Sequence, residues 1–278
     1  VVGFDPEPEE HLRRVEAAIG TIETSKLDKV VLARAVDIEF PEAIDPRLVA
    51  ARLIDLSANR DGFIADLSPA GRPSAMLVGS SPEVLVKRQG STVSAFPLAG
   101  SSPRRATAAE DHIAGQDLLH SAKDLHEHSF VVEHLRRVLS PLCERLDIPD
   151  TPQLISTNEM WHLGTPISGT LKDKDLTALE LALAAHPTPA ICGTPAEAAQ
   201  ALIETAETDR GFYAGAVGWC DSSGDGEYMV AIRCAEVAGD GLSARAWAGG
   251  GIVGDSDAHA ELEETTAKLR TILKALSL

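Results

Sequence analysis

Residues 213–248, YAGAVGWCDSSGDGEYMVAIRCAEVAGDGLSARAWA, contain three stretches with the composition of β-strands. These stretches are 213–220, 228–237 and 242–248, and only short segments rich in Gly, Asp and Ser separate them. Connections this short leave no room for a helical crossover, so we expect the strands to pair antiparallel. The segment therefore predicts a largely antiparallel sheet.

Strand and helix patterns alternate irregularly along the rest of the chain. Strand composition marks 29–40, 62–67, 74–87, 92–96 and 153–171, and helical spacing marks 12–22, 45–56, 123–142, 176–185, 195–205 and 257–276. The helix at 195–205 is expected to start with a capping box, with Thr194 at the N-cap and Glu197 three residues later. Because strands and helices do not alternate regularly, we predict an α+β fold.

The bulk properties exclude several classes of protein. A chain of 278 residues with 44% hydrophobic residues can form a packed globule, and no apolar run approaches the roughly 20 residues of a membrane span. A net charge of −17 disfavours binding to nucleic acid or to an anionic membrane. The four cysteines form no C-x-x-C pair, which disfavours a zinc site or a disulfide framework. We expect a soluble, cytoplasmic protein.

Glu127 is the first residue that suggests a buried site. Apolar residues of the helix at 123–142 form a stripe through Val131 and Leu135, and one turn before Val131 lies Glu127. Burial of an unpaired carboxylate is costly, so an inward Glu127 needs a metal ion, an arginine or a lysine as its partner. The alternative is a frayed first turn with Glu127 in water.

The C-terminal helix carries a second group of charged residues. Glu261, Glu264 and Lys268 share one stripe, although Glu264 and Lys268 could also be an ordinary surface pair at i, i+4. The preceding AGGGIVGDSD, residues 248–257, could present several backbone N–H groups to a carboxylate. Its G-x-G-x-x-G pattern lies too near the C-terminus to open a dinucleotide-binding βαβ unit.

Three further features are ambiguous when taken alone. Lys29 begins an apolar strand and is either a desolvated base or a strand-end lysine with its ammonium group in water. Glu83 follows Ser81-Pro82 between two strand-like stretches, and its role is equally ambiguous. HEHSFVVEH, residues 126–134, has Phe130 where a zinc metalloprotease motif needs its second histidine, which excludes that motif.

Together these segments resemble the chorismate-utilising enzymes, a family that includes isochorismate, salicylate, anthranilate and aminodeoxychorismate synthases. The resemblance covers nearly the whole chain. The matching blocks are KVVLAR (29–34), SPEVLV (81–86), PLAGS (97–101), KDLHEHSFVVE (123–133), HLGTPISG (162–169), HPTPAICGTP (186–195), GFYAGAVGW (211–219), VAIRCAEV (230–237), AGGGIVGDSD (248–257) and ELEETTAKL (261–269). The resemblance implies the family fold, in which largely antiparallel sheets pack in a sandwich surrounded by helices.

The resemblance also implies a role for each ambiguous residue. Glu127 and Glu264, with Glu261 close by, would hold Mg²⁺ against the ring carboxylate of chorismate. Lys29 would be the general base and Glu83 the general acid of a reaction in which water adds at ring carbon 2 and the hydroxyl leaves carbon 4. The residues expected to contact the substrate are Gly100, Ser101, His162, Ala190, Tyr213, Arg233, Gly249 and Lys268.

Within the family, the chain is most similar to isochorismate synthases. Anthranilate synthase does not usually carry lysine at the position of Lys29, and aminodeoxychorismate synthase has a lysine where this chain has Ala99. Ala190 stands where pyruvate-releasing relatives tend to have threonine, so we expect the reaction to stop at isochorismate, for a siderophore, salicylate or menaquinone pathway. The alternatives are a salicylate synthase, a non-catalytic chorismate-binding module and an unrelated acidic metal-binding protein.

The chain as a whole is expected to be one chorismate-binding catalytic domain, 1–278. An N-terminal segment that family members normally carry is expected to be missing, because the sequence begins VVG without methionine. We expect a monomer that binds a small molecule, chorismate, and neither nucleic acid nor a membrane.

Overall fold

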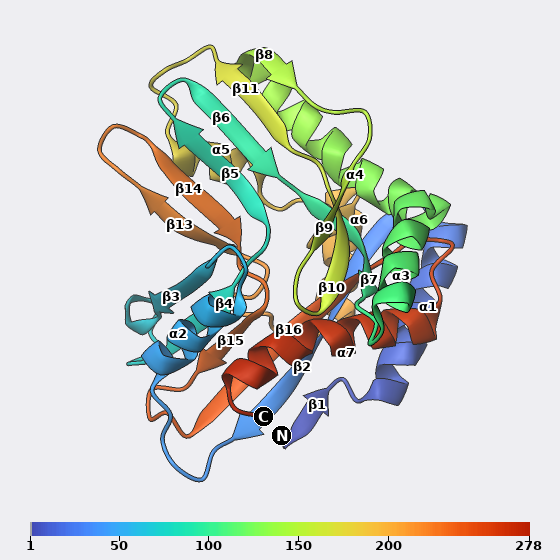
Figure 1. Ribbon diagram of the computed structural model, residues 1–278, viewed down its shortest axis with the longest axis vertical. Coiled ribbons are helices and arrows are strands. Elements are labelled where there is room, and N and C mark those ends of the chain that lie inside the picture. Colours follow the sequence, from blue (N-terminus) through green and yellow to red (C-terminus); the bar gives the residue numbers. More distant parts are fainter. Residues whose placement is uncertain (1) are drawn as a thin grey trace.

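The computed structural model describes residues 2–278 and contains three β-sheets in which every strand pairing is antiparallel (Figure 1). Seven α-helices surround the sheets within this described range. The predicted α+β class and the antiparallel pairing are therefore confirmed.

The first sheet has the strand order β1-β2-β16-β15-β4-β3, and the short β12 pairs with the beginning of β2. Its strands are β1 (Gly3–Asp5), β2 (Lys29–Glu39), β3 (Gly62–Asp66), β4 (Met76–Ser80), β12 (Gly193–Thr194), β15 (Cys234–Val237) and β16 (Ser243–Ile252). The pairing of β2 with β16 is the longest and runs from Glu39 opposite Ser243 to Val30 opposite Ile252.

The other two sheets lie beside the first. The second has the order β13-β14-β5-β6-β11-β8, and the third has the order β7-β10-β9. Their strands are β5 (Val84–Gln89), β6 (Thr92–Phe96), β7 (Leu98–Pro103), β8 (Cys143–Asp147), β9 (Gln153–Ser156), β10 (Met160–Gly164), β11 (Ile167–Leu171), β13 (Ala216–Cys220) and β14 (Gly226–Val230).

The helices cover the outer faces of the sheets. They are α1 (Pro8–Thr24), α2 (Pro46–Leu56), α3 (Ala108–His120), α4 (Ala122–Leu139), α5 (Ala178–Ala185), α6 (Ala196–Ala206) and α7 (Ala258–Ala275). Helix α7 packs on β16, and α4 packs on β7 and α5. No helix within residues 2–278 combines the length and the apolar character that a membrane span requires.

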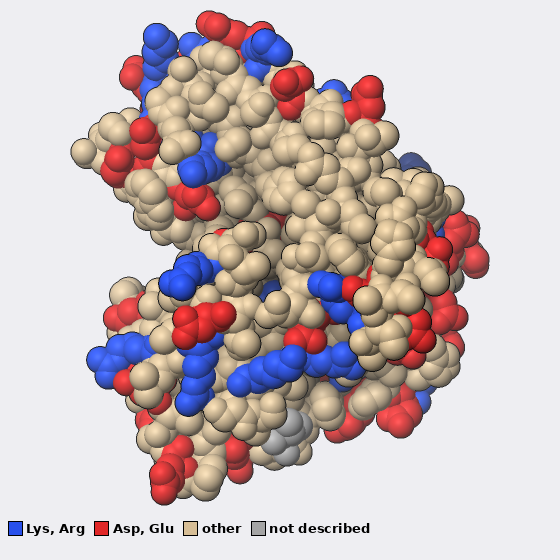
Figure 2. All heavy atoms as spheres, in the orientation of Figure 1, with Lys and Arg blue, Asp and Glu red and all other residues tan. Residues whose placement is uncertain are grey.

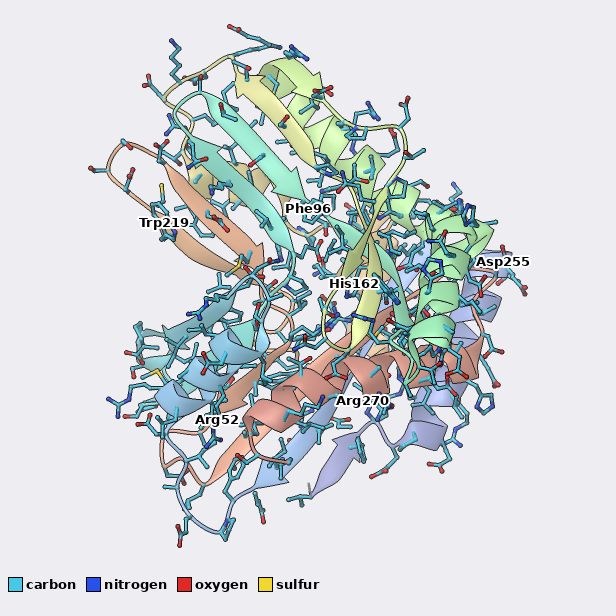
Figure 3. The ribbon with its side chains drawn as sticks, in the orientation of Figure 1. Arg52, Phe96, His162, Trp219, Asp255 and Arg270 are labelled. Atoms are coloured by element: carbon cyan, nitrogen blue, oxygen red, sulfur yellow. The ribbon has the colours of Figure 1, made fainter. Side chains whose placement is uncertain are left out.

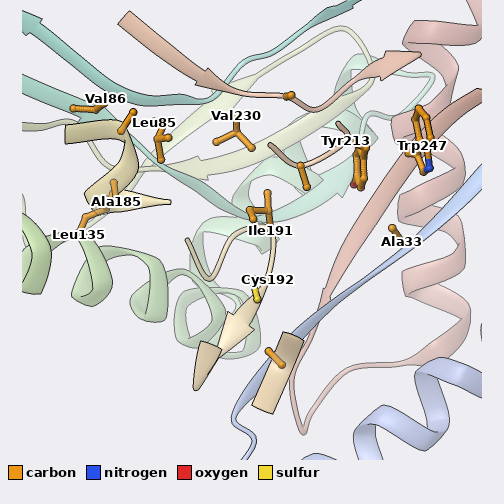
Figure 4. Close-up of a cluster of buried hydrophobic side chains, with 14 of the residues drawn as sticks. Ala33, Leu85, Val86, Leu135, Ala185, Ile191, Cys192, Tyr213, Val230 and Trp247 are labelled. Carbon is orange, nitrogen blue, oxygen red and sulfur yellow. The ribbon is translucent and has the colours of Figure 1, made fainter. Parts of the chain in front are cut away.

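A single hydrophobic core joins the first sheet to the second. Figure 4 shows Leu85, Val86 and Val230 of the second sheet in the same cluster as Ala33 and Trp247 of the first. A smaller core fills the space between the first sheet, α2 and α7. The two large sheets are thus held in a fixed relation, which is a requirement for any site built between them.

The chain crosses between these two sheets at two neighbouring points. The predicted strand 74–87 is in fact two strands, β4 and β5, which lie in different sheets and are joined through Glu83. The predicted strand 228–237 likewise divides into β14 and β15 at Arg233, whose φ is 51°. Because β4 pairs with β15 and β5 pairs with β14, the two crossovers run side by side.

Several elements differ from the sequence-based expectation. The stretch 153–171 forms three strands, β9 to β11, and helix α3 and strands β1, β8 and β12 were not predicted. The predicted capping box at Thr194 is wrong, because Thr194 lies in β12 opposite Lys29 and Pro195 is the N-cap of α6 without a side-chain hydrogen bond. A capping box occurs instead at α5, between Thr177 and Glu180.

We predict that Thr177→Ala lowers the free energy of unfolding by about 1 kcal/mol, because it removes the side-chain cap of α5. Thr194→Ala is the control and should change this free energy by less than about 0.5 kcal/mol. Urea denaturation of both variants measures the difference. Equal effects of the two substitutions would contradict the assignment of the cap.

Candidate active site

Most of the predicted site residues line one cavity where the three sheets meet. Those on its wall are Glu83, Gly100, Ser101, Glu127, His162, Ala190, Tyr213, Arg233, Gly249, Glu264 and Lys268. Glu261 lines an open cleft next to this cavity, and the two spaces share Ser101 and Glu264. Lys29 is fully buried against Glu127, behind the cavity wall. The residues that the resemblance singled out are therefore close together in space.

Lys29 and Glu127 form a buried pair. Lys29 is the first residue of β2, and its Nζ atom lies 3.2 Å from Oε1 of Glu127. The distance is that of an ion pair, but Nζ of Lys29 donates no hydrogen bond of acceptable geometry. Both side chains are buried, which excludes the alternatives of a solvated strand-end lysine and of a frayed helix turn.

Glu83 is a buried carboxyl group at the crossover between β4 and β5. Burial raises its pKa to about 7, although a hydrogen bond from the Leu98 N–H and the charges of Lys29, Lys268 and Arg233 act in the opposite direction. The pKa shows that desolvation outweighs these three cations. Glu83 can therefore carry a proton near neutral pH.

Arg233, at the neighbouring crossover between β14 and β15, forms a buried pair with His162 of β10. The Nη2 atom of Arg233 donates to Nε2 of His162 at 3.2 Å, so His162 must be neutral with its proton on Nδ1. Burial and the charge of Arg233 keep the pKa of His162 well below its ordinary value. Figure 3 shows His162 on β10 near the middle of the molecule. The pair leaves the remaining donors of Arg233 available to an anion.

Four charged side chains from α4 and α7 adjoin the cavity. Nζ of Lys123 lies 2.9 Å from Oε1 of Glu261, and Nζ of Lys268 lies 2.5 Å from Oε1 of Glu264. Burial and the neighbouring Glu264 raise the pKa of Glu261, whereas Lys268 and Lys123 outweigh burial and lower the pKa of Glu264. Glu264 and Lys268 do form the i, i+4 pair, but in a buried place, where Lys268 also donates to the Gly249 carbonyl at 2.9 Å.

The glycines of 248–254 have a different role from the one predicted. Gly249 to Gly251 lie in β16, and none of the glycines in 248–254 has a positive φ, so the backbone forms no anion-binding concavity. A Cβ atom on Gly251 would lie 2.0 Å from Oε1 of Glu127, and one on Gly250 would lie 2.8 Å from Oε2 of Glu261. These glycines instead leave space for carboxylates against the strand.

The acidic residues fit a divalent cation by their chemistry. Oε2 of Glu261 is buried without a hydrogen-bond partner, and it lies on the same side of Gly250 as Oε1 of Glu264. Carboxylate oxygens are the ligands that Mg²⁺ prefers. However, no three His, Cys, Asp or Glu side chains in residues 2–278 already stand in a metal-binding arrangement. The ammonium group of Lys123 lies among the carboxylates instead.

Residues 4–277 match the family model described as chorismate binding enzyme. The chain belongs to this family. It is 45% identical to isochorismate synthase DhbC of Bacillus subtilis, over 98% of this chain and 68% of that protein. Two solved structures are also similar. DhbC of Bacillus anthracis has TM-score 0.95 and 42% identity, with coverage of 99% of this chain and 74% of that chain. The menaquinone-specific isochorismate synthase MenF of Escherichia coli has TM-score 0.83 and 28% identity, with coverage of 98% and 62%.

Two side chains that support the site of this chorismate-binding enzyme were missed in the sequence. His128 is buried, and its two ring nitrogens contact the Ala99 carbonyl at 3.0 Å and the Thr165 hydroxyl at 2.7 Å. Lys123 could have been found, because it precedes Glu127 by four residues on the same face of α4. His128 could also have been found, because it precedes Val131 by three residues and Leu135 by seven, on the buried face of α4.

The side chains of Glu207 and Arg210, which the sequence analysis also missed, bond to backbone groups along β2. Arg210 donates to the carbonyl groups of Ile191 and Val31 at 2.8 and 2.7 Å, and Glu207 accepts the N–H of Ala33 at 2.6 Å. Glu207 and Arg210 also pair with each other. Because Val31 and Ile191 line the cavity, this side-chain pair fixes part of its wall.

The raised pKa of Glu83 predicts a pH-dependent stability. The unfolded chain releases this proton near pH 4.5 and the folded chain near pH 7, so wild type loses stability between these values as pH rises. Relative to wild type, Glu83→Gln should therefore gain about 2 to 3 kcal/mol between pH 5 and pH 8. Urea denaturation at both pH values measures the gain, and a pH-independent difference would contradict the raised pKa.

Proposed function

We propose that the chain converts chorismate to isochorismate. The observation that carries the proposal is the gathering of Glu83, Arg233 and Lys268 on the wall of one cavity, with Lys29 buried behind that wall against Glu127. An acid, a base and two cations that could hold an anion are the groups that this reaction requires. The similarity to proteins named isochorismate synthases supports the same conclusion.

Arg233, Lys268 and Tyr213 are proposed to bind the enolpyruvyl carboxylate of chorismate, beside the backbone of Gly249. Arg233 suits this role because a guanidinium group can donate two parallel hydrogen bonds to a carboxylate. Tyr213 is buried and stacks on Trp247 with a ring separation of 5.9 Å, which fixes the direction of its hydroxyl group. These local cations would allow a protein of net charge −17 to bind a dianion.

Lys29 and Glu83 are proposed to move the protons. Lys29 would take a proton from the water whose oxygen bonds to ring carbon 2, and Glu83 would give its proton to the hydroxyl group that leaves carbon 4 as water. One water molecule is consumed and one is released, so the reaction is an isomerisation. Gly100, Ser101 and His162 are proposed to contact the ring, since all three line the cavity.

Mg²⁺ is proposed as the cofactor, held by Glu127 and Glu264 with Glu261 close by. When bound, it would supply positive charge for the ring carboxylate of the substrate. The partner-free oxygen of Glu261 and the carboxylates gathered beside Gly250 and Gly251 support this assignment.

The product is proposed to be isochorismate without release of pyruvate. Ala190 lines the cavity and presents only a methyl group at that point of the wall. The isochorismate would supply siderophore, salicylate or menaquinone biosynthesis.

Product analysis tests the proposal. Purified wild type with chorismate and Mg²⁺ should form isochorismate, and excess chelator should stop this reversibly. Lys29→Ala and Glu83→Gln should each lower kcat by about 10² to 10⁴, because each removes one proton-transfer group. Chromatography of the products measures the rates. A chain that binds chorismate but never converts it would be a non-catalytic binding module.

Ala190→Thr should introduce pyruvate release, because a threonine hydroxyl can hydrogen-bond the substrate or a water near the enolpyruvyl group. A coupled lactate dehydrogenase assay reports the pyruvate, and Ala190→Val is the control because it adds similar bulk without the hydroxyl group. Stoichiometric pyruvate from wild type would identify a salicylate synthase instead.

A further inference from the structure

Lys123 occupies a central place in the acidic cluster of α4 and α7. Its Nζ atom lies 2.9 Å from Oε1 of Glu261, 3.7 Å from Oδ1 of Asp124 and 3.9 Å from Oε2 of Glu127. Its carboxylate neighbours thus come from both helices. The ammonium group therefore ties the start of α4 to the first turns of α7.

The cluster needs this charge because its carboxylates are buried. The side chains of Glu261 and Glu127 are only 2% and 8% exposed. Glu127 has Lys29 as a second cation, and Glu264 has Lys268. Within residues 2–278, Glu261 pairs with Lys123 alone. Without Lys123, the site would contain a buried carboxylate with no compensating cation, which is costly.

A divalent cation held by Glu127 and Glu261 would share these carboxylates with the ammonium group of Lys123, which already contacts one oxygen of each, and two cations so close together repel each other. We propose that Lys123 is the resident counter-cation of the acidic cluster and that its ammonium group must be displaced when a divalent cation binds. This inference rests on the proposed use of Mg²⁺. It assigns Lys123 as a positioning residue that holds the carboxylates together before the metal arrives.

The structure provides a route for the displacement. Lys123 lines the open cleft beside the cavity, and 23% of its side chain is exposed, whereas Lys29 is fully buried. The flexible four-carbon stem of lysine can move the ammonium group toward the cleft. Glu110 and Asp117 of α3 line the same cleft and could accept the displaced charge.

Lys123→Met tests the proposal because it keeps the stem and removes the charge. In EDTA its Tm should fall by about 3 °C or more, and Mg²⁺ should restore it, since the metal then supplies the missing charge. Its Kd for Mg²⁺ without chorismate, measured by calorimetry, should be lower than that of wild type by about tenfold or more. Lys274→Met is the control, because Lys274 is also on α7 but pairs with Glu159, just before β10 and outside the site.

The control should lower Tm equally with and without Mg²⁺ and leave the Kd unchanged. If Lys123→Met does not fold in EDTA, Lys123→Met/Glu261→Gln should fold and recover the wild-type Tm, because it removes both charges. The proposal is overturned if the Kd of Lys123→Met for Mg²⁺ stays within twofold of the wild-type value. It is also overturned if the double variant does not recover the wild-type Tm. Neither the Tm nor the Kd depends on turnover. Failure of the proposed function would therefore be seen separately, as the absence of isochorismate when wild type is incubated with chorismate and Mg²⁺.

Discussion

The close approach of buried carboxylates to the backbone of β16 is the constraint on which the site depends. Glu127 and Glu261 come from different helices and reach the same strand, at Gly251 and Gly250. Any side chain at these two positions would fill the space that the carboxylates occupy. The same strand pairs with β2 through Ile252, which places Lys29 at the end of the ladder beside Glu127. The glycines at 250 and 251, the register of β16 against β2 and the Lys29–Glu127 ion pair therefore depend on one another.

Charge is balanced locally in this protein, despite its net charge of −17. Glu127, Glu261 and Glu264 each pair with a lysine, and the cations Arg233 and Lys268 face the cavity. Figure 2 shows acidic and basic side chains interspersed on the visible face, so no continuous basic surface marks that face as a site for a polyanion. A small anion can instead be recognised inside, where low exposure strengthens each charge interaction.

The sequence predicts the class of fold, and the helical period raises an inward Glu127 as one of two alternatives, which burial in the structure decides. It does not show where a run of strand-forming residues changes sheet, because 74–87 and 228–237 have the same composition on both sides of the crossover. The capping box at Thr194 was mispredicted for a related reason: pairing with Lys29 outweighs the local capping preference. Glycines 249–251 were expected to present backbone N–H groups to a carboxylate, but they lie in β16, and carboxylates fill the space beside Gly250 and Gly251.

The cations proposed to hold the substrate also act on the pKa of the proposed acid, Glu83. Lys268 and Arg233 lower the pKa of Glu83, although burial still raises it to about 7. A carboxylate bound between these two cations would offset their effect on Glu83 and exclude water from the cavity. Both changes favour the protonated form, so the proton of Glu83 would be held more firmly in the complex than in the free protein. If Arg233 and Lys268 bind the substrate as proposed, the complex would also keep Glu83 protonated until the hydroxyl group leaves.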